Sequence, residues 1–519
     1  MKKRLVAVSL CLAMAFVTLT GCGNSNTGTS GATATATATA ATTGGTLNTV
    51  EGFPYSTLDP HKDYNSWHSQ KYGLTESLFR LTDDMQVEPW LAESLEVTDN
   101  VATLTLKDGV CFSNGNPLTA DMVKRNLERL AETNKRFKYI KDFKLEAKDD
   151  KTLAITMTNV LTTLKNEMAN PEVCMVDLDA TTDIDKNVIS TGPFVVDTFV
   201  PEGDITLKRN DKYWGGTVNL DSVKFFSMRD AQSKLMAMQN GEIDAYDSLS
   251  ATDIEIFKGD PDQYQLSTVP SQARTYMFLN PAKIPDSVRK AILLVLDRES
   301  ITAFMGGTLT PAYGVFSDDA AYGKAQVLKM DAAKAKEILE ADGYTLNSSQ
   351  VYAKDGVPIP TIGLYCYAAR NIDAMAVLIQ EQLTKFGIPT EVKLVEDPDG
   401  SYMTDKNYDI CFYRMTTDKT ADPMTFIDGV IKSGSYQDIA GYGNEASDKE
   451  IETLRYTSDP VKRAELANKI VQDYFDANVF CPLVIYNRNI VMRTGVTNFS
   501  ENNPYEFYVV NANTTAAKK

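Results

Sequence analysis

Apolar and polar residues alternate in several short stretches, and elsewhere apolar residues recur every three or four positions. The alternation predicts strands over 101–107, 152–158, 205–209 and 390–395. The longer spacing predicts helices over 119–132, 286–301, 331–343, 371–387 and 459–475. Strands and helices are mixed along the chain and no repeat is present, which indicates an α/β or α+β body.

Capping residues support several of these helices. Thr119 precedes the first helix and is a suitable N-cap. Asp459 followed by Pro460 is a typical helix start, since proline fits the first turn. Gly343 and Gly387 stand where two helical patterns stop.

The first 22 residues predict export from the cytoplasm. Lys2, Lys3 and Arg4 precede an uncharged run of about 15 residues, which is typical of a secretory signal peptide and too short for a membrane span. Residues 19–22, Leu-Thr-Gly-Cys, resemble the bacterial lipobox, whose cysteine receives lipid after cleavage. We therefore expect a lipoprotein signal peptide at 1–21 and lipid on Cys22. The alternative is a plain signal with an accidental cysteine.

Residues 22–46 are predicted to be the lipid anchor and a disordered linker. Positions 23–46 contain only Gly, Ser, Thr, Ala and Asn, with no charge and no large apolar group. Such a segment buries too little apolar surface to offset its ordering entropy. The body that follows is too long for one small core, so two or more lobes are expected.

The charge balance limits the partners. Acidic residues outnumber basic ones by 69 to 52, the formal net charge is −17 and the pI is about 4.8. Losing the three cations of the signal (−17 − 3) brings the exported chain to about −20. Nucleic acid and an electrostatically bound membrane surface are therefore disfavoured as partners.

Nothing in the sequence marks an enzyme or a resident metal. The five cysteines outside the first 22 residues contain no CxxC pair, which favours buried free thiols over a zinc site or disulfide framework. The only histidines, His61 and His68, are too few for HExxH or a histidine cage, and are expected to be ordinary surface or cleft residues. No GxSxG or P-loop motif occurs. No cofactor is predicted.

Nine phrases in order resemble one protein family. They are TLDP (57–60), EPWLAESLEV (88–97), TLKDGVCFSNGNPLTADMV (105–123), STGPF (190–194), LKRNDKYWGG (207–216), MQNGEIDAY (238–246), FLN (278–280), VRKAILLVLDRESI (288–301) and DAAKAKEILEADGY (331–344). Together they are similar to the extracytoplasmic solute-binding proteins, family 5, of peptide and nickel ABC importers. The resemblance covers residues 47–515, and most of its phrases describe scaffold rather than ligand contacts.

The resemblance implies a two-lobed, class II periplasmic-binding-protein-like α/β fold of the large peptide-binder type, with two crossing strands as the hinge. It places lobe I at 47–271, lobe II at 272–485, and a return to lobe I with the C-terminal tail at 486–519. It implies a monomeric, lipid-anchored, extracytoplasmic receptor that delivers a short peptide to a permease and ATPase. Binding of nickel or another metal chelate is the alternative within the family. An anchored enzyme and a ligand sensor or adhesion protein are further alternatives.

Arg414 and Asp418 are the leading candidates for ligand contact. They follow a strand-like run in YDICFYRMTTDKTADP (408–423). Peptide-binding members commonly carry GW, Asp and DP here, and the aspartate pairs with the ligand's ammonium group. Asp418 occupies that place with one extra residue in the gap, whereas Met415 replaces the tryptophan and Arg414 the glycine. The alternative is a weak surface ion pair between Arg414 and Asp418 themselves.

Other candidates follow from the same resemblance. Arg136 and Tyr139 resemble the nickel branch, where the arginine faces a chelator carboxylate, but Tyr139 replaces a tryptophan. Residues 433–440 lack the histidine that meets the metal in that branch. Tyr413, Tyr436 and Trp67 are further candidate cleft aromatics, for which ordinary packing is the alternative.

Overall fold

The computed structural model describes residues 44–63, 65–369 and 371–517. The predicted signal peptide, Cys22 and the linker up to residue 43 lie outside these residues. Within the described part, helices and strands are mixed throughout the chain, as predicted. No helix in that part is long and apolar enough to cross a membrane.

Two four-stranded sheets form the scaffold of the first half of the chain. One has the order β1 (Thr46–Glu51), β10 (Ser222–Ser227), β9 (Ile205–Arg209) and β8 (Phe194–Phe199). The other has the order β4 (Ala92–Thr98), β5 (Val101–Leu106), β7 (Thr152–Thr156) and β6 (Lys144–Ala147). A small pair, β2 (Phe79–Leu81) and β3 (Val87–Pro89), lies between them in the chain. The helices of this half are α1 (Ser66–Lys71), α2 (Ala120–Thr133), the 3₁₀ helix η1 (Lys135–Asp142), α3 (Leu164–Glu167), α4 (Ala231–Asn240) and α5 (Ala251–Lys258).

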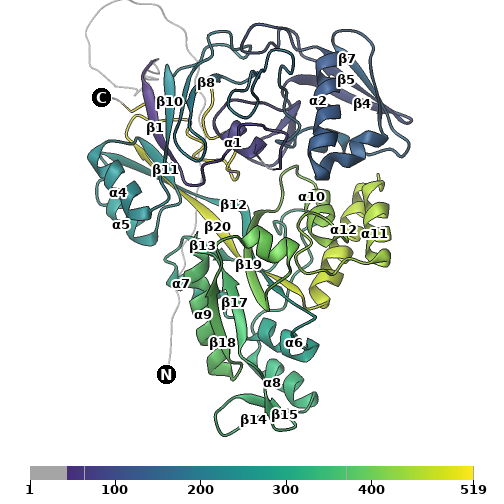
Figure 1. The fold of residues 1–519 in the computed structure, drawn as a ribbon, viewed down its shortest axis with the longest axis vertical. Coiled ribbons are helices and arrows are strands. Elements are labelled where there is room, and N and C mark those ends of the chain that lie inside the picture. Colours follow the sequence, from purple (N-terminus) through teal and green to yellow (C-terminus); the bar gives the residue numbers. More distant parts are fainter. Residues whose placement is uncertain (1–43, 64, 370, 518–519) are drawn as a thin grey trace, which may run out of the picture. The chain divides into compact units, whose positions relative to one another are not determined.

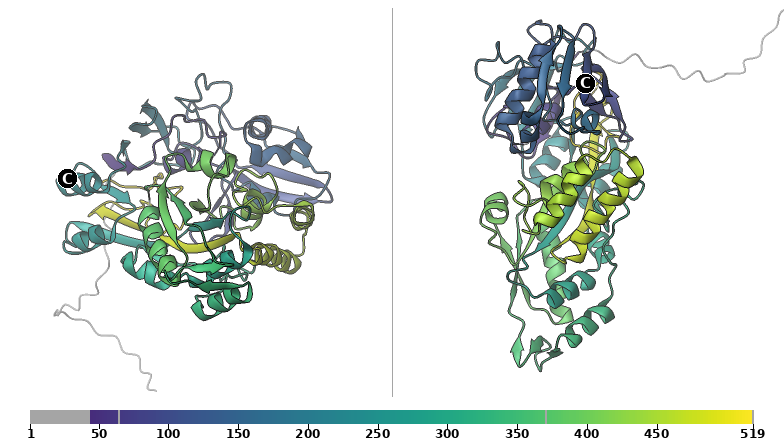
Figure 2. Two further views of the ribbon diagram at one scale, coloured as in Figure 1. Left: turned by 60° about the horizontal axis from the view of Figure 1, so that its bottom comes forward. Right: turned by 90° about the vertical axis from the view of Figure 1, so that its right-hand side faces the viewer.

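A seven-stranded sheet runs through the second half. Its order is β11 (Ala245–Asp247), β20 (Phe480–Arg493), β12 (Tyr264–Leu279), β19 (Ile410–Thr416), β17 (Ile362–Cys366) and β18 (Thr390–Leu394), with β13 (Leu309–Pro311) paired to β20. A small sheet contains β14 (Tyr344–Leu346), β15 (Tyr352–Lys354) and β16 (Val357–Pro358). The helices are α6 (Asp286–Val295), α7 (Arg298–Phe304), α8 (Ala332–Ala341), α9 (Ile372–Phe386), η2 (Gly400–Thr404), α10 (Met424–Phe426), η3 (Ile427–Ile431), α11 (Glu445–Arg455) and α12 (Pro460–Asp476). Helices α11 and α12 lie side by side (Figure 2).

The long strands β12 and β20 connect the two lobes. They pair antiparallel from Tyr264 opposite Arg493 to Phe278 opposite Phe480, with a register shift after Pro270. Figure 1 shows them running from the sheet of β1 and β10 toward β17 and β18. The predicted lobe boundaries, 271/272 and 485/486, fall inside these two strands. The lobe limits themselves stay predictions.

The C-terminal segment packs on the first lobe. Tyr505 and Phe507 are buried against Leu81, and Val509 and Val510 join the core beneath β1 and β9. The first described strand, β1, and the C-terminal segment therefore share one hydrophobic core.

Most predicted elements are confirmed, and one is wrong. Thr119 caps α2 by accepting from the Met122 amide. The single helix expected over 286–301 is instead α6 and α7, because the Asp297 side chain caps the second helix at the Ser300 amide. A carboxylate at that position satisfies an amide of a new helix rather than continuing the old one.

The predictions for cysteine and histidine have mixed outcomes. Cys174, Cys366, Cys411 and Cys481 are buried free thiols, as expected, while Cys111 is half-buried. Both histidines are buried rather than on the surface. The ring of His61 contacts the carbonyl of Cys174 at 3.1 Å, and Nδ1 of His68 lies 3.2 Å from Glu51 Oε2.

Candidate ligand-binding site

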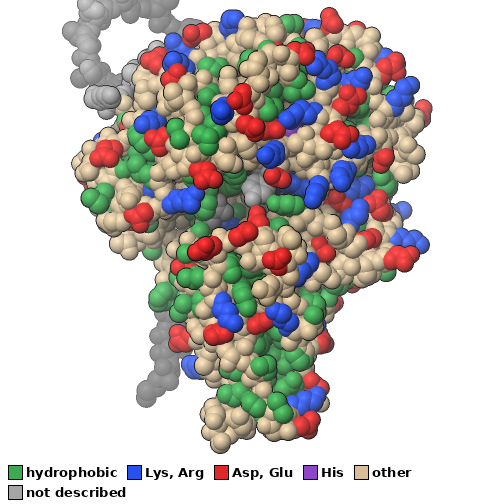
Figure 3. All heavy atoms as spheres, in the orientation of Figure 1, with side chains coloured by type: hydrophobic (Ala, Val, Ile, Leu, Met, Phe, Trp, Pro, Cys, Tyr) green, Lys and Arg blue, Asp and Glu red, His purple; other side chains and the backbone are tan. Residues whose placement is uncertain are grey.

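A cavity of about 660 Å³ lies between segments of the two lobes. The first lobe contributes residues 135–139, Glu167 and Asn170. The second lobe contributes side chains from 397–404 and 424–436, together with Arg455. Figure 3 shows basic and acidic side chains close together where the upper and lower parts of the body meet.

The helix η1 places the first lobe's side chains at the cavity. Asn134 ends α2 and its side chain accepts from the Arg136 amide, which starts η1. Phe137 and Ile140 are buried and anchor η1 in the core below. The first five residues of this short helix, Lys135 to Tyr139, line the cavity.

Arg136 belongs to a group of charges that joins the two lobes. Its guanidinium donates to Glu172 Oε1 at 2.6 Å and to the Asp63 carbonyl at 3.0 Å. Lys419 of the second lobe lies 3.9 Å from the same carboxylate. Burial raises the pKa of Glu172, but the charges of Arg136 and Lys419 hold it below its ordinary value. Burial lowers the pKa of Lys419 to about 8.

Tyr139 takes part in a second contact between the lobes. Its hydroxyl donates to Glu167 Oε2 at 3.0 Å, and the guanidinium of Arg455 lies 5.6 Å from its ring centre. Arg455 in turn forms an ion pair with Asp428. Burial, reinforced by the charges of Asp422 and Asp428, raises the pKa of Glu167 to about 7. Glu167 is therefore a carboxyl group that changes charge near neutral pH.

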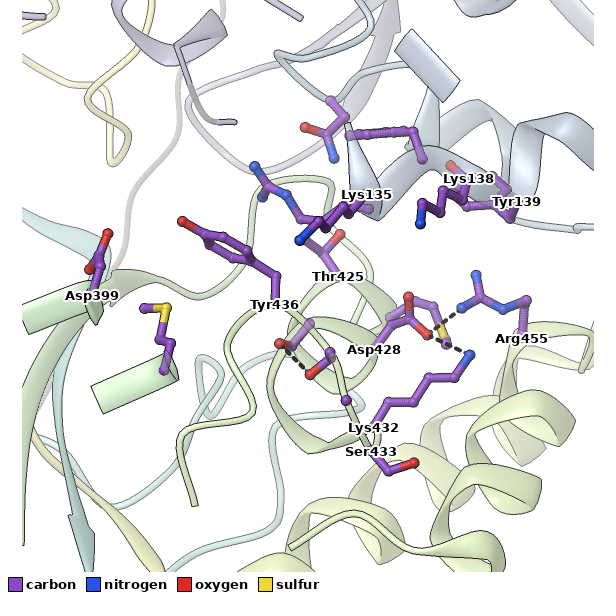
Figure 4. Close-up of a pocket in the computed structure, with 18 of the residues that line it drawn as sticks. Lys135, Lys138, Tyr139, Asp399, Thr425, Asp428, Lys432, Ser433, Tyr436 and Arg455 are labelled. Atoms are coloured by element: carbon purple, nitrogen blue, oxygen red, sulfur yellow. Dashed lines mark hydrogen bonds and ion pairs between the residues drawn. The ribbon is translucent and has the colours of Figure 1, made fainter. Parts of the chain in front are cut away.

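Tyr436 lines the cavity on the side of the second lobe. Figure 4 shows Tyr436 and Lys135 on facing sides, one from each lobe. Tyr413 is adjacent rather than lining, because its hydroxyl donates to Asp399 at 2.8 Å and Asp399 forms part of the wall. The structure thus brings three predicted residues, Arg136, Tyr139 and Tyr436, to one cavity.

Arg414 and Asp418 do not form an ion pair with each other in the described part of the chain. Arg414 pairs with Glu506 and stacks over Tyr486, 4.3 Å from the ring centre. Asp418 accepts from the Tyr322 hydroxyl at 2.7 Å. Both are buried, and burial raises the pKa of Asp418 to about 6. The alternative of a weak surface ion pair between Arg414 and Asp418 is therefore wrong.

Trp67 packs beside the C-terminal segment and is not among the residues that line the cavity. It contacts the cluster of Leu81, Tyr505 and Phe507, and its ring meets that of His68 edge-on at 4.9 Å. Its indole Nε1 is buried without a hydrogen-bond partner.

The residues that the sequence did not single out are mostly charged partners. Glu172 pairs with Arg136 and Glu506 pairs with Arg414, each from a distant position in the chain. Lys419 approaches Glu172 from the other lobe. Charge alone does not distinguish them from the many exposed acidic and basic residues.

The cavity contains no ready metal site. No histidine or cysteine is among its lining residues. In the described residues, no group of three or more His, Cys, Asp or Glu side chains is placed to hold a metal ion. A metal bound here would need ligands from its own chelator.

The comparisons with known proteins establish the family. The model of the bacterial extracellular solute-binding proteins, family 5 Middle, matches residues 86–438. The chain belongs to this family. Family 5 proteins are the periplasmic or extracytoplasmic substrate-binding proteins of ABC transporters, and they are binding proteins rather than enzymes. Their fold has two lobes, as predicted.

Relatives within family 5 differ in what they bind. The chain is 26% identical over 477 residues to a nickel-binding protein of Staphylococcus aureus, covering 90% of this chain and 92% of the relative. It is 24% identical over 462 residues to a glutathione-binding protein of Salmonella typhi, covering 84% and 88%.

Solved family 5 structures show the same fold. The Staphylococcus aureus nickel-binding protein in complex with Ni(L-His)₂ matches with a TM-score of 0.80 at 23% identity, covering 91% of this chain and 99% of the other. The Bacillus subtilis oligopeptide-binding protein AppA in complex with a nonapeptide matches with a TM-score of 0.77 at 21% identity, covering 92% and 100%.

Proposed function

We propose that the protein captures a short peptide or peptide-like ligand between its lobes and delivers it to the permease and ATPase of an ABC importer. The cavity between the lobes carries this proposal. Its volume of about 660 Å³ is within the range of about 300–1,000 Å³ typical of small-ligand sites. Closure around a ligand converts contacts with both lobes into one stable shape that a permease can recognise.

The charges around the cavity support a ligand with both an amine and a carboxylate. Lys135 and Lys138 bring cations from the first lobe, and Asp397 and Asp428 bring carboxylates from the second. A zwitterionic ligand can pair with groups of both signs, whereas an apolar ligand would leave them desolvated. Predicted contacts with Arg136, Tyr139, Tyr436, Tyr413, Trp67, Arg414 and Asp418 belong to this proposal.

A metal chelate is the second candidate. The nickel-binding relative, 26% identical, favours it. Because no histidine or cysteine lines the cavity, the chelator would supply the metal's ligands and the protein would contact the chelator's carboxylates.

The protein's setting in the cell is part of the same proposal. Lipid on Cys22 would hold a monomeric receptor at the outer face of the cell membrane. No catalysis is proposed. A sensor or adhesion role would be favoured instead if no permease and ATPase genes adjoined this one.

Native mass spectrometry of protein purified without refolding tests the proposal. We expect one small molecule per chain, released on unfolding, whose mass corresponds to a short peptide or a metal chelate. Isothermal titration with a tripeptide pool, and with nickel plus L-histidine, provides a second readout. Absence of a retained mass together with no heat of binding from either mixture would reject this ligand class.

A further inference from the structure

Arg274 occupies a central position in the molecule. It lies on the crossing strand β12, opposite Met415 of β19 and Ile485 of β20. Its residue is only 3% exposed. Arg274 therefore lies buried where the two connecting strands, β12 and β20, pair next to β19 of the second lobe.

The guanidinium of Arg274 lacks a partner within the described chain. Its Nε and Nη1 atoms are buried without a hydrogen-bond acceptor, and it forms no ion pair with a described residue. Every other buried arginine in the described residues donates at least one hydrogen bond: Arg289, Arg298, Arg414, Arg455, Arg463 and Arg488. Arg274 is the exception.

An unpartnered buried guanidinium needs an acceptor. Arginine keeps its charge in proteins, so it cannot relieve burial by losing a proton. Burial lowers the pKa of Arg274, and the nearby Tyr276, Asp418 and Asp318 only partly oppose this. Its planar fork of donors matches a carboxylate geometrically.

The surroundings of Arg274 connect it to the cavity. Asp418, whose charge acts on Arg274, also accepts from the Thr420 amide at 3.3 Å. The Thr420 hydroxyl lies 3.2 Å from that of Thr425, which lines the cavity. One short segment, 418–425, thus contributes Thr425 to the cavity lining and Asp418 to the charges that act on Arg274.

We infer that Arg274 is the anchor for a carboxylate of the bound ligand, next to Asp418, which holds the ligand's amine. This inference rests on the proposed function and narrows its ligand class to molecules with a free carboxylate. Nothing in the sequence pattern around 264–279 distinguishes Arg274 from a scaffold residue, so only its burial and missing acceptor identify it.

Paired probes test the inference by removing the carboxylate charge. Trialanine is compared with its C-terminal amide, and nickel plus L-histidine with nickel plus L-histidinamide, by isothermal titration against the wild type and Arg274→Met. The wild type is expected to bind at least one acid on the order of 30-fold or more tightly than its amide. Arg274→Met should lose this preference, and Arg274→Lys should keep part of it. An acid preference unchanged in Arg274→Met would overturn the inference.

The stability of the ligand-free protein gives an independent measurement. Removing an unpaired buried charge should leave the melting temperature of Arg274→Met equal to or above that of the wild type. Arg289→Met is the control, because it removes a buried arginine bonded to backbone carbonyls and should melt lower without altering acid preference. If Arg274→Met melts lower or fails to fold while Arg274→Lys folds, the guanidinium serves the fold and the inference is wrong.

Acetate separates this inference from the proposed function. If none of the four probes binds the wild type, the proposed ligand class fails. Protection of the wild type against heat by acetate relative to acetamide, absent in Arg274→Met, would still support an anion site at Arg274. Equal protection of both proteins would overturn it.

Discussion

Arg414 forms an ion pair with Glu506, although the two residues are 92 positions apart. Arg414 belongs to β19, and Glu506 lies in the C-terminal segment that packs on the first lobe. Their side chains are 3% and 11% exposed. The pair is therefore largely buried, and it links a strand of the second lobe to the C-terminal segment.

Removing one partner of this pair should destabilise the protein. Arg414→Met removes the guanidinium with which the buried Glu506 carboxylate pairs, and we expect a loss of about 3–5 kcal/mol in the free energy of unfolding. The double variant Arg414→Met with Glu506→Leu should recover much of it. Urea unfolding of both measures the effect. The exposed pair of Arg209 and Asp221 is the control, whose removal should cost less than about 1 kcal/mol.

Asp418 is expected to bind the ligand's amine. Asp418→Asn should weaken binding of trialanine by about 2–5 kcal/mol, since the ligand's ammonium group is left buried and unpaired. N-acetyl-trialanine, which has no amine, should bind both proteins equally weakly. The pKa of Asp418 is about 6 because of burial, so affinity for trialanine should fall as the pH drops below 6. If the wild type and Asp418→Asn bind trialanine with affinities within about twofold of each other, Asp418 does not contact the ligand.

Glu167 should make stability depend on pH. Its pKa is raised from 4.5 to about 7, so the folded protein binds more protons than the unfolded chain between these values. Stability from this group is complete below pH 4.5 and is lost as the pH rises through 7. The charges that face it are Asp422, Asp428 and Arg455, with the Tyr139 hydroxyl.

Glu167→Gln isolates this effect. Between pH 4.5 and 8, the free energy of unfolding of the wild type should fall by on the order of 2–3 kcal/mol relative to that of the variant. Urea unfolding at four pH values measures the difference. A constant difference across this range would mean that Glu167 ionises at its ordinary pKa.

Asn166 should contribute to closure of the lobes. Its side-chain amide donates to the Thr420 carbonyl at 2.8 Å, from one lobe to the other. Asn166→Ala should weaken binding of the co-purified ligand by about 0.5–1.5 kcal/mol and reduce the decrease in radius of gyration seen by solution scattering. Asn100→Ala is the matched control, because Asn100 bonds to the Met157 carbonyl within the first lobe and should leave affinity unchanged.

Cys22 should determine where the protein is found in the cell. Cys22→Ala is expected to release it into the soluble fraction and to abolish labelling by a fatty-acid analogue, because a single lipid-modified residue would be its anchor. Continued membrane retention and labelling of the variant would contradict lipidation at this position.

The sequence predicted the local structure better than the site. Caps such as Thr119 and Asp459 act within their own helices, so their effect is visible in a few consecutive residues. The resemblance supplied the two-lobed fold. The break at Asp297 was readable in principle, since Asp297 and Ser300 have the spacing of a helix cap.

The partners of the site residues were not predictable in this way. Tyr322 reaches Asp418 across 96 positions, and Lys419 meets Glu172 from the other lobe. Hydrophobic periodicity carries no information about which distant polar groups meet after folding. The missing acceptor of Arg274 is likewise a property of its three-dimensional surroundings.

The packing of Tyr505 and Phe507 on Leu81 has a consequence for the order in which the protein can be completed during synthesis. The core of the first lobe needs residues that leave the ribosome last. The second lobe, about 200 residues between β12 and β20, takes roughly 10–40 s to translate at about 5–20 residues per second. Throughout that interval the first lobe lacks the part of its core that Tyr505 and Phe507 supply, so its packing is completed only after the second lobe has been synthesised.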